Sequence, residues 1–178
     1  MARLSFGCFI PRALCGVVEN MALTLIGGGS RSGKSSYALS RARDLGNRLG
    51  FLATAQAFDE EMRQRIESHR LDRGRQFTTI EEPIDLCAAI NRYEKAFDVI
   101  VIDCLTLWVS NLLMMERQEI EQDCAQLVER AAHASCHLIL VTNEVGCGIV
   151  PENAVARRFR DLAGRLKQLA AAQGDDVF

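Results

Sequence analysis

The chain has 178 residues, of which 48% are hydrophobic and 25% charged, and its formal net charge at pH 7 is −2. This length is enough for one domain with a sizeable core and short for two. A net charge so close to zero gives no sign of the strongly basic surface typical of proteins that bind nucleic acid or an anionic membrane, so we expect neither as a partner.

The first twenty residues carry short apolar stretches, interrupted by Pro11, with no clear period. These stretches are too short and broken for a membrane-spanning helix, and they lack the clean apolar core and cleavage site of a signal peptide. Met21 stands directly before the first strand-like run. We therefore expect residues 1–20 to be a disordered extension or a misassigned start, and residues 21–178 to form a single P-loop nucleotide-binding and transferase domain.

From Leu23 onward, β-prone apolar runs alternate with helical patterns. The predicted strands are residues 22–26, 50–55, 77–80, 98–103 and 137–142. The predicted helices are residues 36–43, 60–69, 84–93, 105–115, 117–134 and 153–172. We expect Asp59 to cap the second helix and Pro83 to open the third. The alternation predicts an α/β fold with a mostly parallel sheet and helices on both of its faces.

The stretch between the first strand and the first helix fits the phosphate-loop pattern G-x-x-x-x-G-K-[ST]. Its glycines let successive backbone N–H groups point at phosphate oxygens, and the following helix adds positive charge at its N-terminus. In such a loop Lys34 reaches the β- and γ-phosphates and the Ser35 hydroxyl is a ligand of Mg²⁺. A surface loop rich in Gly and Ser is the alternative, which the flanking strand and helix disfavour. The predicted nucleotide-binding residues of this loop are Gly28, Gly29, Ser30, Arg31, Ser32, Gly33, Lys34 and Ser35.

Charged and polar residues follow the later strands, notably Glu81, Asp103 and Asn143 with Glu144. Ligands of an open parallel sheet bind outside the carboxyl ends of its strands, so we expect these residues to face one site. Asp103 closes the clearest buried strand and matches the aspartate that orients Mg²⁺ in phosphate-loop NTPases. A solvated strand-end or helix-capping aspartate is the alternative. With the phosphate loop present, we predict that Ser35 and Asp103 hold Mg²⁺, partly through water.

His69 falls on the same face of its predicted helix as Met62, Ile66 and Arg73. A histidine on an apolar stripe is commonly a packed core residue. Arginines are concentrated at positions 63–75 and again at 157–165, and guanidinium groups of this kind suit a polyphosphate. From the residues alone, both a core role and a functional role for His69 remain open.

The seven cysteines form no C-x-x-C pair, and their number is odd. This pattern predicts neither a disulfide framework nor a zinc site. We expect most of them to be small buried residues of a protein in a reducing cytoplasm.

Together these residues resemble the bifunctional adenosylcobinamide kinase / adenosylcobinamide-phosphate guanylyltransferase family of cobalamin biosynthesis. The resemblance extends from Leu25 to about Ala172. The phosphate loop is common to many families. More diagnostic are the run E-M-x-x-R-I-x-x-H that ends at His69, the block N-E-V-G-C-G-I-V-P over 143–151, and R-F-R-D over 158–161. Lys167 departs from the family, which usually has Asn at that position.

The resemblance implies two reactions. In the first, ATP or GTP donates its γ-phosphoryl group to the aminopropanol hydroxyl of adenosylcobinamide, with Lys34, Asp103 and Mg²⁺ neutralising charge. In the second, His69 attacks the α-phosphorus of GTP, and the resulting GMP–histidine transfers GMP to adenosylcobinamide phosphate to give adenosylcobinamide-GDP. The resemblance thus implies that His69 and Lys34 are catalytic, and that the protein is a homotrimer with its site near the subunit boundary. The further nucleotide contacts that it implies are Ala53, Thr54, Ala55, Arg70, Leu71, Asp72, Arg73, Glu81 and Asp103.

Family members continue past the last helix into a further strand, of which this chain holds only the first residues, ending at Phe178. We therefore expect a truncated last strand. Two other functions stay open. One is another phosphate-loop kinase or ATPase in which His69 is structural. The other is a nucleotide-binding protein that the missing strand has made catalytically silent.

Overall fold

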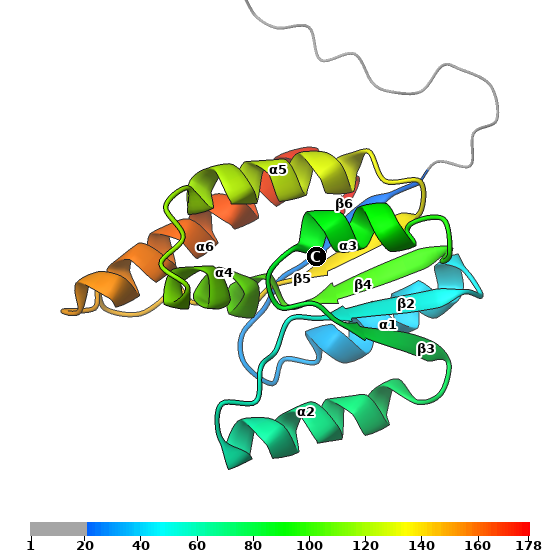
Figure 1. The fold of residues 1–178 in the computed structure, drawn as a ribbon, viewed down its shortest axis with the longest axis horizontal. Helices are drawn as coiled ribbons and strands as arrows, with labels where there is room; N and C mark the ends of the chain where they lie inside the picture. Colours follow the sequence, from blue (N-terminus) through cyan, green and yellow to red (C-terminus); the bar gives the residue numbers. More distant parts are fainter. Residues whose placement is uncertain (1–20) are drawn as a thin grey trace, which may run out of the picture.

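A six-stranded sheet forms the centre of the structure, a computed structural model that describes residues 21–178. Its strands are β1 (Leu23–Ile26), β2 (Leu49–Ala53), β3 (Phe77–Glu81), β4 (Val99–Asp103), β5 (His137–Val141) and β6 (Asp176–Val177). Their spatial order is β3-β2-β4-β5-β1-β6, and every pairing is parallel (Figure 1). The predicted parallel α/β fold is thus confirmed. The predictions for residues 1–20 lie outside the described residues.

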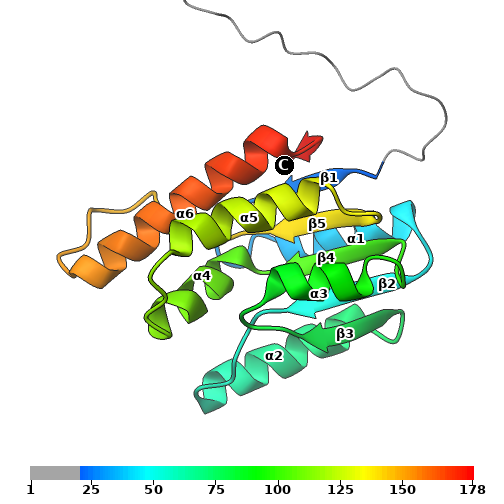
Figure 2. The ribbon, with the colours of Figure 1, turned by 45° about the horizontal axis from the view of Figure 1, so that its top comes forward.

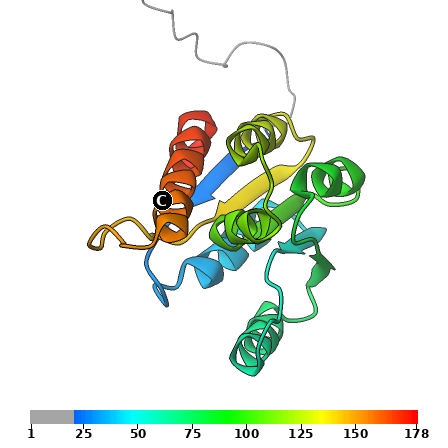
Figure 3. The same ribbon diagram turned by 60° about the vertical axis from the view of Figure 1, so that its left-hand side comes forward.

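Six helices connect the described strands. They are α1 (Lys34–Leu45), α2 (Glu60–Arg73), α3 (Leu86–Tyr93), α4 (Leu105–Met114), α5 (Ile120–Ala132) and α6 (Ala154–Gln173). Helices α3, α4, α5 and α6 lie on one face of the sheet and α1 on the other, as predicted (Figure 2). Helix α2 lies near the β3 edge, apart from the other helices (Figure 3). Across residues 21–178, no helix has both the length and the apolar character that crossing a membrane requires.

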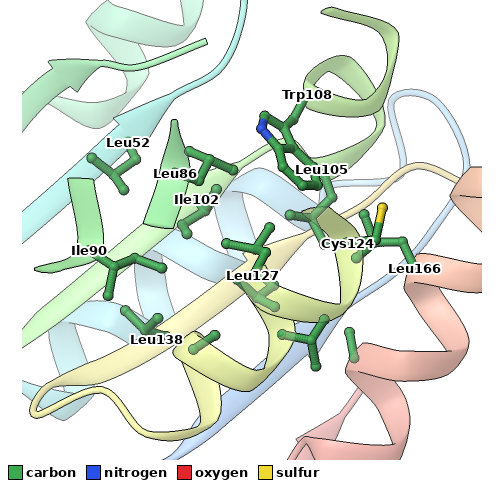
Figure 4. Close-up of a cluster of buried hydrophobic side chains, with 14 of the residues drawn as sticks. Leu52, Leu86, Ile90, Ile102, Leu105, Trp108, Cys124, Leu127, Leu138 and Leu166 are labelled. Atoms are coloured by element: carbon green, nitrogen blue, oxygen red, sulfur yellow. The ribbon is translucent and has the colours of Figure 1, made fainter. Parts of the chain in front are cut away.

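The apolar core is divided between the two faces of the sheet. In β4, Ile100 and Ile102 face the larger cluster, which includes Leu127 of α5 (Figure 4). The alternate residue Val101 belongs to the second cluster, where it is packed with Leu39 of α1. Successive side chains of a strand point to opposite faces, so a strand covered on both sides has a continuous apolar run. This is why the strand at 98–103 could be predicted from its composition.

The third helix begins later than predicted, because Pro83 lies in a turn before it. Helix α3 is capped by Asp85, whose carboxylate accepts the N–H of Ala88 at 3.0 Å. The Glu82 carboxylate accepts two further backbone N–H groups in that turn, at 3.0 and 2.7 Å. These carboxylates accept the N–H groups just before the helix and in its first turn. The helix therefore begins at Leu86 and does not extend back to Pro83. Helix α5 likewise begins three residues after its predicted start, at Ile120.

The last residues of the chain lie beside β1, where β6 forms an edge strand of two residues. Phe178 extends this pairing, since its N–H donates to Leu25 at 2.9 Å and its carbonyl accepts from Gly27 at 2.8 Å. Its ring meets the edge of the Tyr37 ring with centroids 5.3 Å apart. The short strand expected here is therefore present, and it is paired with the strand that leads into the phosphate loop.

Asp98 joins the turn before β2 to the start of β4. The hydrogen bonds that its carboxylate accepts there predict a low pKa for this group. The carboxylate accepts hydrogen bonds from the Arg48 guanidinium at 2.8 Å and from the backbone N–H groups of Arg48 and Asn47 at 2.9 and 3.0 Å. These bonds, the Arg48 side chain first, lower the pKa of Asp98 from 3.8 to about 2. The folded-state pKa lies below the unfolded value, so the contribution to stability is complete above the unfolded pKa and is lost as the pH falls toward 2.

We therefore expect the Asp98 carboxyl carbon to titrate with a midpoint near 2 when its chemical shift is followed by NMR. In an Arg48→Met variant the midpoint should rise only partly, because both backbone donors remain. A wild-type midpoint at the ordinary aspartate value would contradict the hydrogen bonding described here.

Candidate active site

A cavity of about 1010 Å³ lies at the carboxyl ends of the strands, between the phosphate loop and α2. Parallel strands all end at the same edge of a sheet, so groups distant in the sequence meet there. Most of the predicted site residues line this cavity: Arg31, Ser32, Gly33, Lys34, Ser35, Ala53, Ala55, His69, Arg70, Arg73, Glu81 and Asp103.

Some of the predicted residues lie elsewhere. Among the described residues, Gly28, Gly29 and Ser30 form the first half of the phosphate loop and do not line the cavity. Thr54 is fully buried behind the cavity wall, and the Leu71 side chain is 74% exposed on α2. The side chain of Asp72 lies outside the described part of the structure.

The phosphate loop leads directly into α1. Gly33, just before the helix, has φ 86°, a left-handed conformation that favours glycine. A Cβ on Gly28 would lie 2.7 Å from the Ser32 hydroxyl oxygen, too close for a larger residue without a shift. The Lys34 ammonium donates to the Gly29 carbonyl at 3.0 Å, so the lysine folds back over its own loop. The loop therefore combines unpaired helix N–H groups with the cationic side chains of Arg31 and Lys34, which is the chemistry of a phosphate site.

Asp103 is the last residue of β4, is half-buried, and lines the cavity together with Lys34 and Ser35. A carboxylate and a hydroxyl oxygen suit Mg²⁺, which commonly takes one or two carboxylates and completes its shell with water and substrate phosphates. The residues present therefore fit a magnesium–nucleotide complex at this end of the cavity.

Helix α2 contributes Met62, Ile66, His69 and Arg73 to the cavity wall, the face that helical spacing predicts. Asp59 caps this helix as predicted, its carboxylate accepting the Met62 N–H at 2.7 Å. His69 is exposed rather than packed in the core. Its ring is therefore accessible from the cavity, as a nucleophile must be.

Arg73 is a buried cation in the cavity wall, only 6% exposed. Its guanidinium carbon lies 4.1 Å from the centre of the Phe51 ring, and its Nε has no hydrogen-bond partner among the described residues. Burial lowers the pKa of the guanidinium, and the nearby carboxylates of Asp103 and Glu81 oppose that shift. A buried guanidinium with an unpaired N–H is suited to an anionic ligand, because a charge-assisted hydrogen bond would satisfy it.

A buried hydrogen-bond network supports the cavity from behind. The Thr54 hydroxyl accepts the N–H of Cys104 at 2.7 Å and donates to its carbonyl at 2.9 Å, which joins the ends of β2 and β4. The Asn111 amide donates to the carbonyls of Thr54 at 2.8 Å and Pro83 at 3.0 Å. Buried polar groups that are hydrogen-bonded fix their surroundings, so this network holds the strand ends in place. Sequence reasoning assigned no role to Asn111, although this residue lies in the part of the chain that resembles the family.

The two arginine-rich segments lie in different places. The first contributes Arg70 and Arg73 to the cavity described above. The second surrounds a separate hollow of about 420 Å³ beside α6. Its charged lining residues are Glu121, Arg157, Arg158, Asp161 and Arg165.

The sequence of this chain is similar to those of known proteins. The family model described as cobinamide kinase / cobinamide phosphate guanyltransferase matches residues 24–178. The chain is 40% identical over 154 residues to the bifunctional adenosylcobalamin biosynthesis protein CobP of Pseudomonas aeruginosa, an alignment that covers 86% of this chain and 89% of that protein. It is 37% identical over 171 residues to the proteins of the same description named CobU in Escherichia coli and Salmonella typhimurium, with 88% of this chain and 93% of each relative covered. The chain therefore belongs to the cobinamide kinase / cobinamide phosphate guanyltransferase family.

Proposed function

We propose that this protein phosphorylates adenosylcobinamide with a nucleoside triphosphate and then transfers GMP from GTP to adenosylcobinamide phosphate. The observation that carries the proposal is a single cavity lined by both the phosphate loop and the exposed His69. A phosphate loop alone serves many kinases and ATPases. An accessible histidine in the same cavity adds a nucleophile, and membership of the family supplies the substrates and disfavours the alternatives.

In the first reaction, the aminopropanol hydroxyl of adenosylcobinamide attacks the γ-phosphorus, and the bond from that phosphorus to the leaving nucleoside diphosphate breaks. Lys34 and the N–H groups at the start of α1 hold the β- and γ-phosphates. Ser35 and Asp103 hold Mg²⁺, which neutralises phosphate charge when bound. Because charge is redistributed rather than created in this step, catalysis depends on positioning and electrostatics.

In the second reaction, a neutral ring nitrogen of His69 attacks the α-phosphorus of GTP and pyrophosphate leaves. The phosphate of adenosylcobinamide phosphate then attacks the same phosphorus, which releases His69 and forms adenosylcobinamide-GDP. Arg70 and Arg73, on the same helix as His69, balance the phosphate charge. The remaining nucleotide contacts in this proposal are Ala53, Ala55 and Glu81, which line the same cavity.

The proposal includes a homotrimer with its site near the boundary between subunits, as the family resemblance implies. It also includes a cytoplasmic location. The five cysteines among the described residues are all free, which suits a reducing compartment.

The proposed function is tested by incubating the full chain with adenosylcobinamide, Mg²⁺ and GTP and identifying the corrinoid products by mass spectrometry. Adenosylcobinamide phosphate should form first and adenosylcobinamide-GDP second. With ATP as the only nucleotide the reaction should stop at the phosphate, because ATP cannot supply GMP. Folded protein that binds GTP and forms neither product would contradict the proposal.

A further inference from the structure

We infer that Asn143 positions the acceptor hydroxyl for attack on the γ-phosphorus, and that Thr106 holds the Asn143 side chain in the orientation this requires. The inference rests on the proposed function and deepens it, since it assigns a residue to one of the two reactions and not to the other.

The strand order places Asn143 beside the transferred phosphoryl group. Strand β5 lies between β1, which leads into the phosphate loop, and β4, which ends at Asp103. Asn143 follows β5 and therefore emerges between the two, where it lines the cavity. The N–H groups of the residues on either side of it donate to the carbonyls of Ile26 and Gly28, at 2.9 and 2.8 Å. These bonds fix its backbone against the phosphate loop.

The side chain of Asn143 is held by a buried hydroxyl. Its Nδ2 donates to Thr106 Oγ1 at 3.0 Å, and its backbone N–H donates to the same oxygen at 3.3 Å. Thr106 is only 3% exposed, and its hydroxyl also lies 3.1 Å from the sulfur of Cys104. The Asn143 Oδ1 accepts no hydrogen bond from the backbone and side chains that the structure describes. A fixed amide oxygen in the cavity wall is an acceptor for a hydroxyl donor, such as the attacking alcohol of the first reaction.

Other groups near Asn143 are committed elsewhere. The Glu144 carboxylate is paired with Lys167 of α6 and accepts the N–H of Gly146 at 2.5 Å, and it is not among the described residues that line the cavity. In the proposed function, Asp103 serves Mg²⁺. His69 comes from α2 at the β3 edge, and β2 and β4 separate that edge from β5. Asn143 is therefore placed for chemistry at the γ-phosphorus and away from the guanylylated histidine.

In this step the acceptor oxygen forms a bond to the γ-phosphorus, and the nucleoside diphosphate leaves with the electrons of the broken P–O bond. The hydroxyl proton passes to an oxygen of the transferred phosphoryl group. The carboxamide of Asn143 takes up no proton, so it acts by orienting the hydroxyl and not as a general base.

The inference is tested with an Asn143→Ala variant, measured separately in the two reactions. We expect kcat for phosphorylation of adenosylcobinamide to fall about 10²-fold, the loss typical of a misplaced reacting group, with the KM for the nucleoside triphosphate nearly unchanged. Guanylylation of the protein by GTP alone should proceed as in the wild type, because that reaction uses no acceptor hydroxyl. Asn111→Ala is the matched control, since Asn111 supports the strand ends without lining the cavity. The Asn111→Ala variant should lower the rates of both reactions by similar factors.

The inference would be overturned if Asn143→Ala lowered the rates of both reactions equally. It would also be overturned if the variant raised the KM for the nucleotide and left kcat unchanged. If that variant does not fold, Thr106→Val carries the same test, because it removes the hydroxyl that holds Asn143 and leaves its Nδ2 only the weak contact with the Cys104 sulfur at 3.5 Å. It should lower kcat for phosphorylation selectively. Wild-type protein that phosphorylates no adenosylcobinamide would overturn the proposed function as well, whereas parallel losses in the variant overturn this inference alone.

Discussion

Replacement of His69 by alanine is expected to abolish covalent attachment of GMP while phosphorylation of adenosylcobinamide continues. The imidazole is exposed in the cavity and is the proposed nucleophile, and alanine offers no atom that could replace it. The measurement uses GTP labelled at the α-phosphorus, after which the protein is denatured and its bound label counted. The label should be acid-labile and alkali-stable, as a histidine phosphoramidate is.

His133→Ala is the matched control for this experiment. His133 is also exposed, but it lies at the end of α5 and does not line the cavity. It should retain the full label. Label that persists in His69→Ala would show that another residue is the nucleophile, and the assignment of the second reaction to His69 would be wrong.

Replacement of Lys34 by alanine should have the largest effect on the first reaction. Lys34 is one of the two cations of the phosphate loop, and it lines the cavity together with Asp103. By analogy with the removal of one preorganised donor to developing charge, kcat should fall at least about 10²- to 10³-fold. Guanylylation of His69 should persist in part, because its nucleophile is intact. Steady-state rates of adenosylcobinamide phosphorylation check this expectation.

Lys95→Ala serves as the control for the loss of one positive charge. Lys95 is exposed after α3 and lies away from the cavity. It should leave both reactions unchanged. A Lys34→Ala variant with a wild-type phosphorylation rate would exclude the phosphate loop as the site of the first reaction.

The fold could be predicted largely because its strands are buried on both faces. Such strands appear as continuous apolar runs, and the run at 98–103 is the clearest example. Helix starts were less predictable, since proline is compatible both with a first helical turn and with a preceding turn. At α3 the carboxylates of Glu82 and Asp85 accept backbone N–H groups, which places Pro83 in the preceding turn and not in the helix. The spatial order of the strands was not predicted, because nothing in the spacing of the runs specifies it.

The candidate site, like the fold, could be predicted from the sequence only in part. The phosphate loop and Asp103 could be identified because local motifs encode their chemistry. Within the predicted segment 70–73, however, helix geometry separates an exposed Leu71 from a buried Arg73. The Asn111 contact joins residues 57 positions apart in the sequence, so no local pattern could indicate it. For the same reason, the location of Asn143 between the phosphate loop and Asp103 becomes visible only once the strand order is known.

The most direct test of the proposal that one cavity serves both reactions is to locate the GMP on the protein. After incubation with GTP and Mg²⁺, the wild-type chain would be digested with trypsin at alkaline pH, which preserves a phosphoramidate, and its peptides analysed by mass spectrometry. Cleavage after Arg65 and Arg70 releases the peptide Ile66–Arg70, whose single histidine is His69. The proposal predicts GMP on this peptide. GMP on any other peptide, or adenosylcobinamide-GDP formed by protein that carries no adduct, would contradict it.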